Sequence, residues 1–140
     1  MTAVDEVLIP IQCEYYALEG VGQLLGNIGM IREHLNNNLH ISAIVLTMYD
    51  ARTRLAADVA DEVRGQFGQV VLNNVIPRSV KVSEAPGYGQ TVIDYDPGSR
   101  GALAYFDAAK ELATRGDYQP HPTTGPIGVS PEVYNQLEEE

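Results

Sequence analysis

Residues Val75 to Gly89 read V-I-P-R-S-V-K-V-S-E-A-P-G-Y-G, and the rest of the chain can be organised around them. A run rich in β-branched residues ends at Pro77, which has no N–H group to donate to a sheet ladder. Two cations, Arg78 and Lys81, come next, and the prolines and glycines that follow indicate a loop. A strand that gives way to a basic loop is typical of the carboxyl edge of an α/β sheet, where open α/β folds bind their ligands.

The apolar pattern of the remaining chain predicts two further strands and three helices. Short apolar runs of the kind found in buried parallel strands alternate with segments in which apolar residues recur at helical spacing. The expected strands are 7–11, 41–47 and 70–76, and the expected helices are about 17–36, 52–67 and 99–115. Right-handed crossovers between parallel strands are the default for this order. We therefore expect an α/β fold that forms part of a doubly wound, mainly parallel sheet with flanking helices.

Three finer expectations follow from the same pattern. Asp50 lies where an N-cap or first-turn acid would favour the second helix. The last helix should carry Leu103, Phe106, Ala109 and Ala113 on one apolar side. Three parallel strands would make a narrow sheet with at least one exposed edge.

The charge of the chain is strongly negative but unevenly distributed. The formal net charge is −10 for 140 residues, which is at most one domain. Residues 117–140 hold five acidic residues, four prolines and no Lys or Arg, so we expect a domain over 1–116 and a disordered acidic tail over 117–140. Five of the nine basic residues fall between positions 50 and 81. A basic face on an acidic protein is therefore compatible with the composition.

Other features of the sequence exclude several classes of protein. The single cysteine, Cys13, rules out an internal disulfide, suits a reducing compartment and follows a strand in which a packing role is expected. No apolar run approaches the roughly 20 residues that cross a bilayer, and no N-terminal secretion signal is recognisable. No His, Cys or carboxylate cluster has the spacing of a metal site. We therefore expect a cytoplasmic protein without a membrane partner or a metal site.

Four blocks of the sequence resemble the ParA/Soj partition ATPases, in the order in which that family has them. They are V-L-I-P-I-Q-C-E-Y-Y-A-L-E-G (Val7 to Gly20), L-T-M-Y-D-A-R-T (Leu46 to Thr53), I-P-R-S-V-K-V-S-E-A-P (Ile76 to Pro86) and Y-D-P-G-S-R-G-A (Tyr95 to Ala102). Together they extend over roughly residues 4 to 115. The chain resembles only the C-terminal half of this deviant Walker family, which belongs to the MinD/ParA superfamily.

The resemblance implies a P-loop NTPase-like fold whose N-terminal half is missing. It also implies a role in chromosome or plasmid partitioning: ATP and Mg²⁺ would drive homodimer formation, and the dimer would bind non-specific DNA on the nucleoid. A centromere-binding ParB-type protein would stimulate hydrolysis. The phosphate-binding loop G-x-x-x-x-G-K-[ST] is absent, because the two lysines, Lys81 and Lys110, follow valine and alanine. We therefore expect this chain alone neither to hydrolyse ATP nor to bind it tightly.

The resemblance assigns four residues to an adenine pocket. They are Thr47, Met48, Pro77 and Arg78, which follow the second and third expected strands. Backbone groups at strand ends could bind the purine edge, while Met and Pro flank its face. The alternative is that Met48 and Pro77 only end the strands and pack there.

The resemblance assigns two further residues, Arg52 and Lys81, to DNA binding. Both lie at junctions from which a cation can reach a phosphate. The alternative is that both are ordinary solvated surface charges. Lys81 stands where arginine is usual, so the charge is kept and the bidentate geometry is lost. Ser79 and Gly87 also depart from the usual Asn and Ser.

Other identities stay open at this point. A MinD-type division ATPase resembles ParA but ends in a basic amphipathic membrane helix, whereas the C-terminus here is acidic and rich in proline. A stand-alone module that binds DNA or a full-length partner without catalysis is compatible with the methionine directly before the first strand. A fragment of a longer gene is equally compatible.

Overall fold

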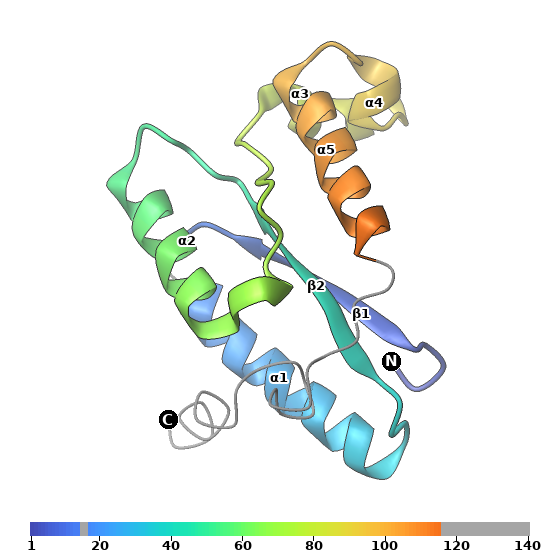
Figure 1. Ribbon diagram of the computed structural model, residues 1–140. Coiled ribbons are helices and arrows are strands. Elements are labelled where there is room, and N and C mark those ends of the chain that lie inside the picture. Colours follow the sequence, from blue (N-terminus) through green and yellow to red (C-terminus); the bar gives the residue numbers. More distant parts are fainter. Residues whose placement is uncertain (15–16, 116–140) are drawn as a thin grey trace.

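The computed structural model describes residues 1–14 and 17–115, and the predicted tail over 117–140 lies outside this part of the chain. Figure 1 shows a parallel pair of strands flanked by long helices, with a group of short helices next to α5. The main elements are β1 (Glu6–Gln12), α1 (Ala17–His34), β2 (His40–Thr47), α2 (Arg54–Phe67) and α5 (Arg100–Thr114). The short elements are η1 (Gly68–Val70), α3 (Val80–Glu84), η2 (Ala85–Tyr88) and α4 (Val92–Tyr95). The predicted α/β class is confirmed.

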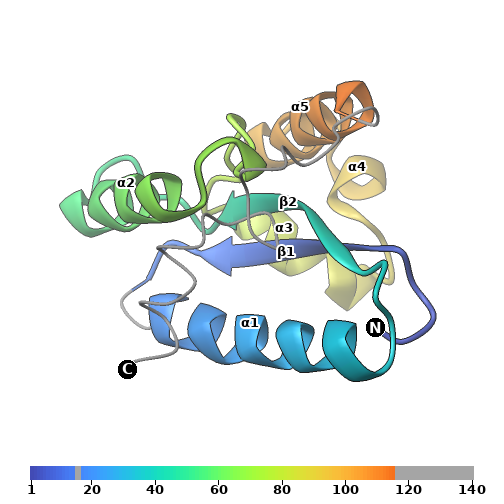
Figure 2. The same cartoon turned by 60° about the horizontal axis from the view of Figure 1, so that its bottom comes forward.

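Helices lie on both faces of the strands, and Figure 2 shows α1 and α5 on opposite sides. Successive residues of a strand point to opposite faces, and β2 follows this rule. Ile44 and Leu46 pack in one core cluster with buried residues of α1 and α2. Ala43 and Val45 pack in a second cluster with Ala108 of α5. The fold is therefore a helix–sheet–helix sandwich with β2 buried on both faces.

The start of α2 differs from the prediction. Thr53 is the N-cap, with extended backbone, and its hydroxyl accepts a hydrogen bond from Ala56 N–H. Asp50 was predicted at this position, but it lies three residues upstream and forms the preceding turn. Its carbonyl accepts hydrogen bonds from the N–H and the hydroxyl of Thr53. The carboxylate of Asp50 is thus left free to interact elsewhere.

The predicted third strand over 70–76 is wrong as a continuous strand, because the sheet has two strands in the described part of the chain. The segment runs beside β2 and is joined by two parallel bridges, one to β2 (Ile44 to Val71) and one to the turn after it (Tyr49 to Pro77). Its N–H groups at Leu72 and Ile76 donate to Ile44 and Leu46, both at 2.8 Å. A step of four residues in this segment, from Leu72 to Ile76, therefore corresponds to a step of two residues in β2, from Ile44 to Leu46, whereas a regular strand would keep the two steps equal.

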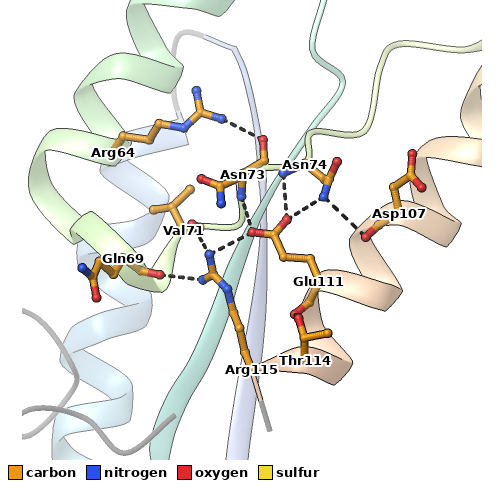
Figure 3. A network of polar contacts seen from close by, with 9 residues as sticks. All are labelled: Arg64, Gln69, Val71, Asn73, Asn74, Asp107, Glu111, Thr114 and Arg115. Atoms are coloured by element: carbon orange, nitrogen blue, oxygen red, sulfur yellow. Dashed lines mark hydrogen bonds and ion pairs between the residues drawn. The ribbon is translucent and has the colours of Figure 1, made fainter. Parts of the chain in front are cut away.

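The carboxylate of Glu111 on α5 explains the interruption. It accepts hydrogen bonds from the backbone N–H groups of Asn73 and Asn74 at 2.6 and 2.9 Å. Figure 3 shows Glu111 between these asparagines and Arg115, whose guanidinium donates to Glu111 at 2.8 Å. Arg115 also donates to the carbonyl groups of Gln69 and Val71. We call the side chains of Glu111 on α5 and of Arg115, which caps this helix, the clasp, because together they satisfy backbone groups of Gln69, Val71, Asn73 and Asn74.

The loop predicted after Pro77 is folded into the short elements α3, η2 and α4. Gly89 ends η2 in the left-handed region at φ 66°, and the Thr91 hydroxyl caps α4. A third small core holds Ala85, Val92 and Ala102. A Cβ atom at Gly101 would lie 2.6 Å from Cγ2 of Val82, so α5 approaches α3 closely only because residue 101 is glycine.

The predicted apolar side of α5 is also wrong. Leu103 and Phe106 are 53% and 48% exposed, and Ala109 and Ala113 are exposed as well. The buried side consists of the small residues Gly101, Ala102 and Ala108. Small residues allow α5 to lie close to α3 and β2, and Leu103 and Phe106 then face away from the described core.

Candidate functional site

A groove with a volume of about 800 Å³ lies at the carboxyl edge of the strands. Its walls come from the turn after β2, the segment around Pro77, α3 and the first half of α5. Four cations line it, together with two acids: Arg52, Arg78, Lys81 and Arg100, with Asp50 and Asp107. The groove therefore gathers cations from positions up to 48 residues apart, in a chain with a net charge of −10.

Arg52 is held at the groove by Asp50. Its Nε and Nη2 atoms donate to Oδ1 and Oδ2 of Asp50, both at 2.9 Å, and its backbone N–H donates to Oδ1 at 3.0 Å. These hydrogen bonds lower the pKa of Asp50 to about 2. The Arg52 side chain is nevertheless 87% exposed. The pairing thus fixes the direction of the guanidinium without burying it.

Lys81 lies between a carboxylate and an aromatic ring. Its Nζ is 3.7 Å from Oε2 of Glu84 and 5.5 Å from the centre of the Tyr95 ring. The Tyr95 hydroxyl donates to Glu84 at 3.0 Å, and this hydrogen bond is the main reason why the pKa of Tyr95 is raised. The ring of Tyr88 stacks on that of Tyr95 at 5.2 Å. Lys81 is therefore positioned by a small cluster of α3, η2 and α4.

Arg78 and Arg100 complete the basic lining. Nη1 of Arg78 is 3.8 Å from Oε1 of Glu14, and its backbone N–H donates to the carbonyl of Tyr49. Arg100 is the exposed first residue of α5. Arg100 was not among the residues expected from the sequence to lie in the site. A signal was present, because a cation directly after the N-cap Ser99 opposes the helix dipole and therefore needs another reason to be there.

The four residues predicted for an adenine pocket fall at the ends of neighbouring segments, but only two of them line the groove. Pro77 and Arg78 line it, while Thr47, the last residue of β2, and Met48 directly after it do not. The Thr47 carbonyl accepts a hydrogen bond from Cys13 N–H at 2.9 Å. Met48 is half-buried and has φ 54°, a left-handed conformation. Among the described residues, no partner bonds to its backbone N–H or carbonyl.

The described residues offer neither a metal site nor a membrane-spanning helix. No group of three or more His, Cys, Asp or Glu side chains in residues 1–14 and 17–115 could hold a metal ion. In the same part of the chain, no helix combines the length and the apolar character that crossing a membrane requires.

Comparison with known proteins identifies the family. The model of a family described as "AAA domain" matches residues 1–41. The sporulation initiation inhibitor protein Soj of Bacillus subtilis is 53% identical over 116 residues, which are 83% of this chain and 46% of Soj. The chromosome partitioning protein ParA of Caulobacter vibrioides is 49% identical over 115 residues, 82% of this chain and 43% of ParA. The chain belongs to the ParA/Soj family.

Solved structures agree with the predicted fold of this ParA/Soj chain. Cobyrinic acid a,c-diamide synthase from Mycobacterium smegmatis, with bound ADP and magnesium, has a TM-score of 0.62 at 31% identity. The match covers 83% of this chain and 40% of the synthase. The cell division ATPase MinD of Pyrococcus furiosus has a TM-score of 0.59 at 26% identity and is covered to 44%, against 81% of this chain. The ParA/Soj chain thus spans less than half the length of the relatives that it matches.

Proposed function

We propose that this ParA/Soj chain supplies the DNA contacts and part of the adenine pocket of a partition ATPase. The observation that carries the proposal is the convergence of Arg52, Arg78, Lys81 and Arg100 on one groove. A protein with a net charge of −10 repels DNA overall, so phosphates can be bound only where cations are concentrated. The groove is such a place, and its cations contact phosphates without reading base sequence.

Adenine would bind where β2 and the segment before Pro77 end. The backbone N–H and carbonyl of Met48 offer one donor and one acceptor, which a purine edge can use. The bridge from Tyr49 to Pro77 keeps the two segment ends adjacent, so Pro77 can flank the base. This geometry fits the base of ATP. The Thr47 carbonyl is already bonded to Cys13, so Thr47 would contribute its side chain.

The phosphates and Mg²⁺ of ATP need residues that the described part of this chain does not offer. The sequence holds no G-x-x-x-x-G-K-[ST] loop, and its lysines, Lys81 and Lys110, lie outside any glycine-rich context of that form. We expect no Mg²⁺-dependent ATP turnover by the 140-residue chain alone. Homodimer formation, stimulation by a ParB-type protein and a place on the nucleoid in the cytoplasm belong to the same proposal for the longer protein.

The proposal is tested by placing this chain in B. subtilis Soj, in exchange for the region that it matches. ATP-dependent binding to unrelated DNA duplexes is measured over a salt series, for the unaltered chimera and for Arg52→Ala and Lys81→Ala. Counterion release predicts that each lost phosphate contact reduces the slope of log affinity against log salt by about 0.9.

Arg54→Ala is the matched control, because Arg54 is 93% exposed, lies two residues from Arg52 and does not line the groove. ATP binding should be unchanged in all three variants. Unchanged slopes for Arg52→Ala and Lys81→Ala would mean that neither residue contacts a DNA phosphate and that both are ordinary surface charges.

A further inference from the structure

Arg100 shares a groove with Arg52 and Lys81 but differs from them in its pairing. Arg52, Arg78 and Lys81 have carboxylate partners within 4.0 Å, namely Asp50, Glu14 and Glu84. Among the described residues, no carboxylate lies at that distance from Arg100. Arg100 is therefore the cation of the groove whose charge is least neutralised by its surroundings.

The position of Arg100 in its helix also opposes stability. It is the first residue of the 15-residue helix α5, where the partial positive charge of the helix dipole disfavours a cation. Proteins break such local rules mainly at functional or strained sites. An anion in the groove would supply the missing compensation.

The packing of α5 on α3 fixes where Arg100 lies relative to Lys81. Gly101 follows Arg100, and a Cβ atom there would lie 2.6 Å from Cγ2 of Val82 and 3.3 Å from Cβ of Ser79. Val82 in turn follows Lys81 in α3. The two cations are thus carried by segments that pack closely at the residues next to them, so they can act on neighbouring phosphates of one rigid ligand.

We propose that Arg100 contacts a phosphate of the DNA backbone and extends the surface formed by Arg52 and Lys81. This inference rests on the proposed DNA-binding function of the groove. A nucleotide could supply the same phosphate chemistry, and the experiment separates the two sources. DNA is favoured because the cations are spread along an open groove that includes both α3 and α5.

The experiment uses the chimera in which this chain replaces the matching region of B. subtilis Soj, because DNA binding is proposed for the ATP-bound longer protein. Fluorescence anisotropy with two unrelated DNA duplexes is recorded with ATP over a salt series for the unaltered chimera, Arg100→Ala and Arg100→Lys. Arg100→Ala should reduce the log–log salt slope by about 0.9 on both duplexes, and Arg100→Lys should keep the slope. Lys110→Ala is the matched control, because Lys110 is exposed on the same helix and does not line the groove.

Each outcome decides the question. Circular dichroism should show Arg100→Ala folded as the unaltered chimera is, since alanine suits the first turn of a helix. An unchanged slope for Arg100→Ala, with reduced slopes for Arg52→Ala and Lys81→Ala, would overturn this inference and leave the proposed function standing. Unchanged slopes for all three, or no DNA binding by the unaltered chimera with ATP even at low salt, would overturn both. Weaker ATP binding with unchanged DNA binding in Arg100→Ala would assign the phosphate to a nucleotide instead.

Discussion

Asp50 connects the groove to the start of α2. Its carbonyl accepts hydrogen bonds from Thr53, which caps the helix, and its carboxylate holds the guanidinium of Arg52. One residue thus sets both the turn and the direction of a groove cation. The sequence signalled that an acid mattered here, but the position of Asp50 alone did not distinguish capping the helix from pairing with Arg52.

The pairing of Asp50 with Arg52 predicts a specific pH dependence. The pKa of Asp50 in the folded chain is about 2, below its ordinary value of 3.8. A depressed pKa stabilises the fold fully above about pH 4, and this contribution is lost as the pH falls toward 2. Arg52→Ala should move the Asp50 titration midpoint up toward 3.8, as measured by NMR of the carboxyl carbon.

Arg54→Ala serves as the control, because Arg54 pairs with Asp58 and should leave the Asp50 midpoint unchanged. A midpoint near 3.8 in the unaltered chain would show that the Asp50–Arg52 hydrogen bonds do not persist in solution.

At the scale of elements, the clasp decides how the third segment lies beside β2. Burial raises the pKa of Glu111, but hydrogen bonds from Asn73 and Asn74 and the charge of Arg115 outweigh it, so the pKa is lowered. The Glu111 side chain is 12% exposed. A carboxylate with this many donors is therefore a structural anchor for residues 73 and 74.

Removing the anchor should destabilise the fold. Glu111→Ala leaves two backbone N–H groups and Arg115 without their acceptor, which should lower the free energy of unfolding by about 2 kcal/mol. Urea unfolding followed by circular dichroism measures this. Glu62→Ala, at an exposed position of α2, should change it by less than about 0.5 kcal/mol. Equal stability of Glu111→Ala and the unaltered chain would mean that water replaces the carboxylate without cost.

The contact between α3 and α5 gives a second prediction at this scale. Gly101→Ala gains about 1 kcal/mol of helix propensity but places a methyl group 2.6 Å from Cγ2 of Val82. Overpacking typically costs about 1–3 kcal/mol, so a net loss of stability is expected. Val82→Ala removes the opposing methyl group, and the double variant should be more stable than Gly101→Ala alone in urea unfolding. If the loss of stability in the double variant equalled the sum of the losses in the two single variants, the contact between residues 101 and 82 would be refuted.

Periodicity predicted the long elements well and the short or interrupted ones poorly. The apolar runs of β1 and β2 and the helical spacing of α1 and α2 carry enough residues to be recognised. The elements α3, η2 and α4 hold four or five residues each, which is too few for a periodic pattern. The third strand failed because its competing partner, Glu111, lies 37 residues beyond Asn74.

The sequence predicted that the candidate groove would be basic, but it predicted only some of the residues that line it. The carboxyl edge, Arg52, Pro77, Arg78 and Lys81 were expected, and the structure brings these four residues into one groove. Arg100 was missed because its proximity depends on how α5 packs on α3. The prediction of the buried side of α5 was wrong for a related reason. Alanine and glycine carry little hydrophobic signal in the sequence, yet they are the residues that pack where helices approach closely.

At the scale of the whole molecule, the apolar surface is incompletely covered. β1 pairs with β2 on one side, and among the described residues no strand pairs with its other edge. Leu8 of β1 is 42% exposed, and Leu103 and Phe106 of α5 are 53% and 48% exposed. Unpaired strand edges and exposed apolar side chains both favour association.

The 140-residue chain should therefore associate, and the edge of β1 should be the main cause. Sedimentation velocity should show a concentration-dependent mass, and the melting temperature should rise with protein concentration. Leu8→Lys places a charge on the exposed face of the edge strand and should reduce association strongly, because lysine on an edge strand opposes pairing with another chain. Phe106→Lys introduces the same charge on α5 and should reduce it less. The reverse order would place the contact on α5, and a cooperative, concentration-independent melt of a strict monomer would show that neither surface drives association.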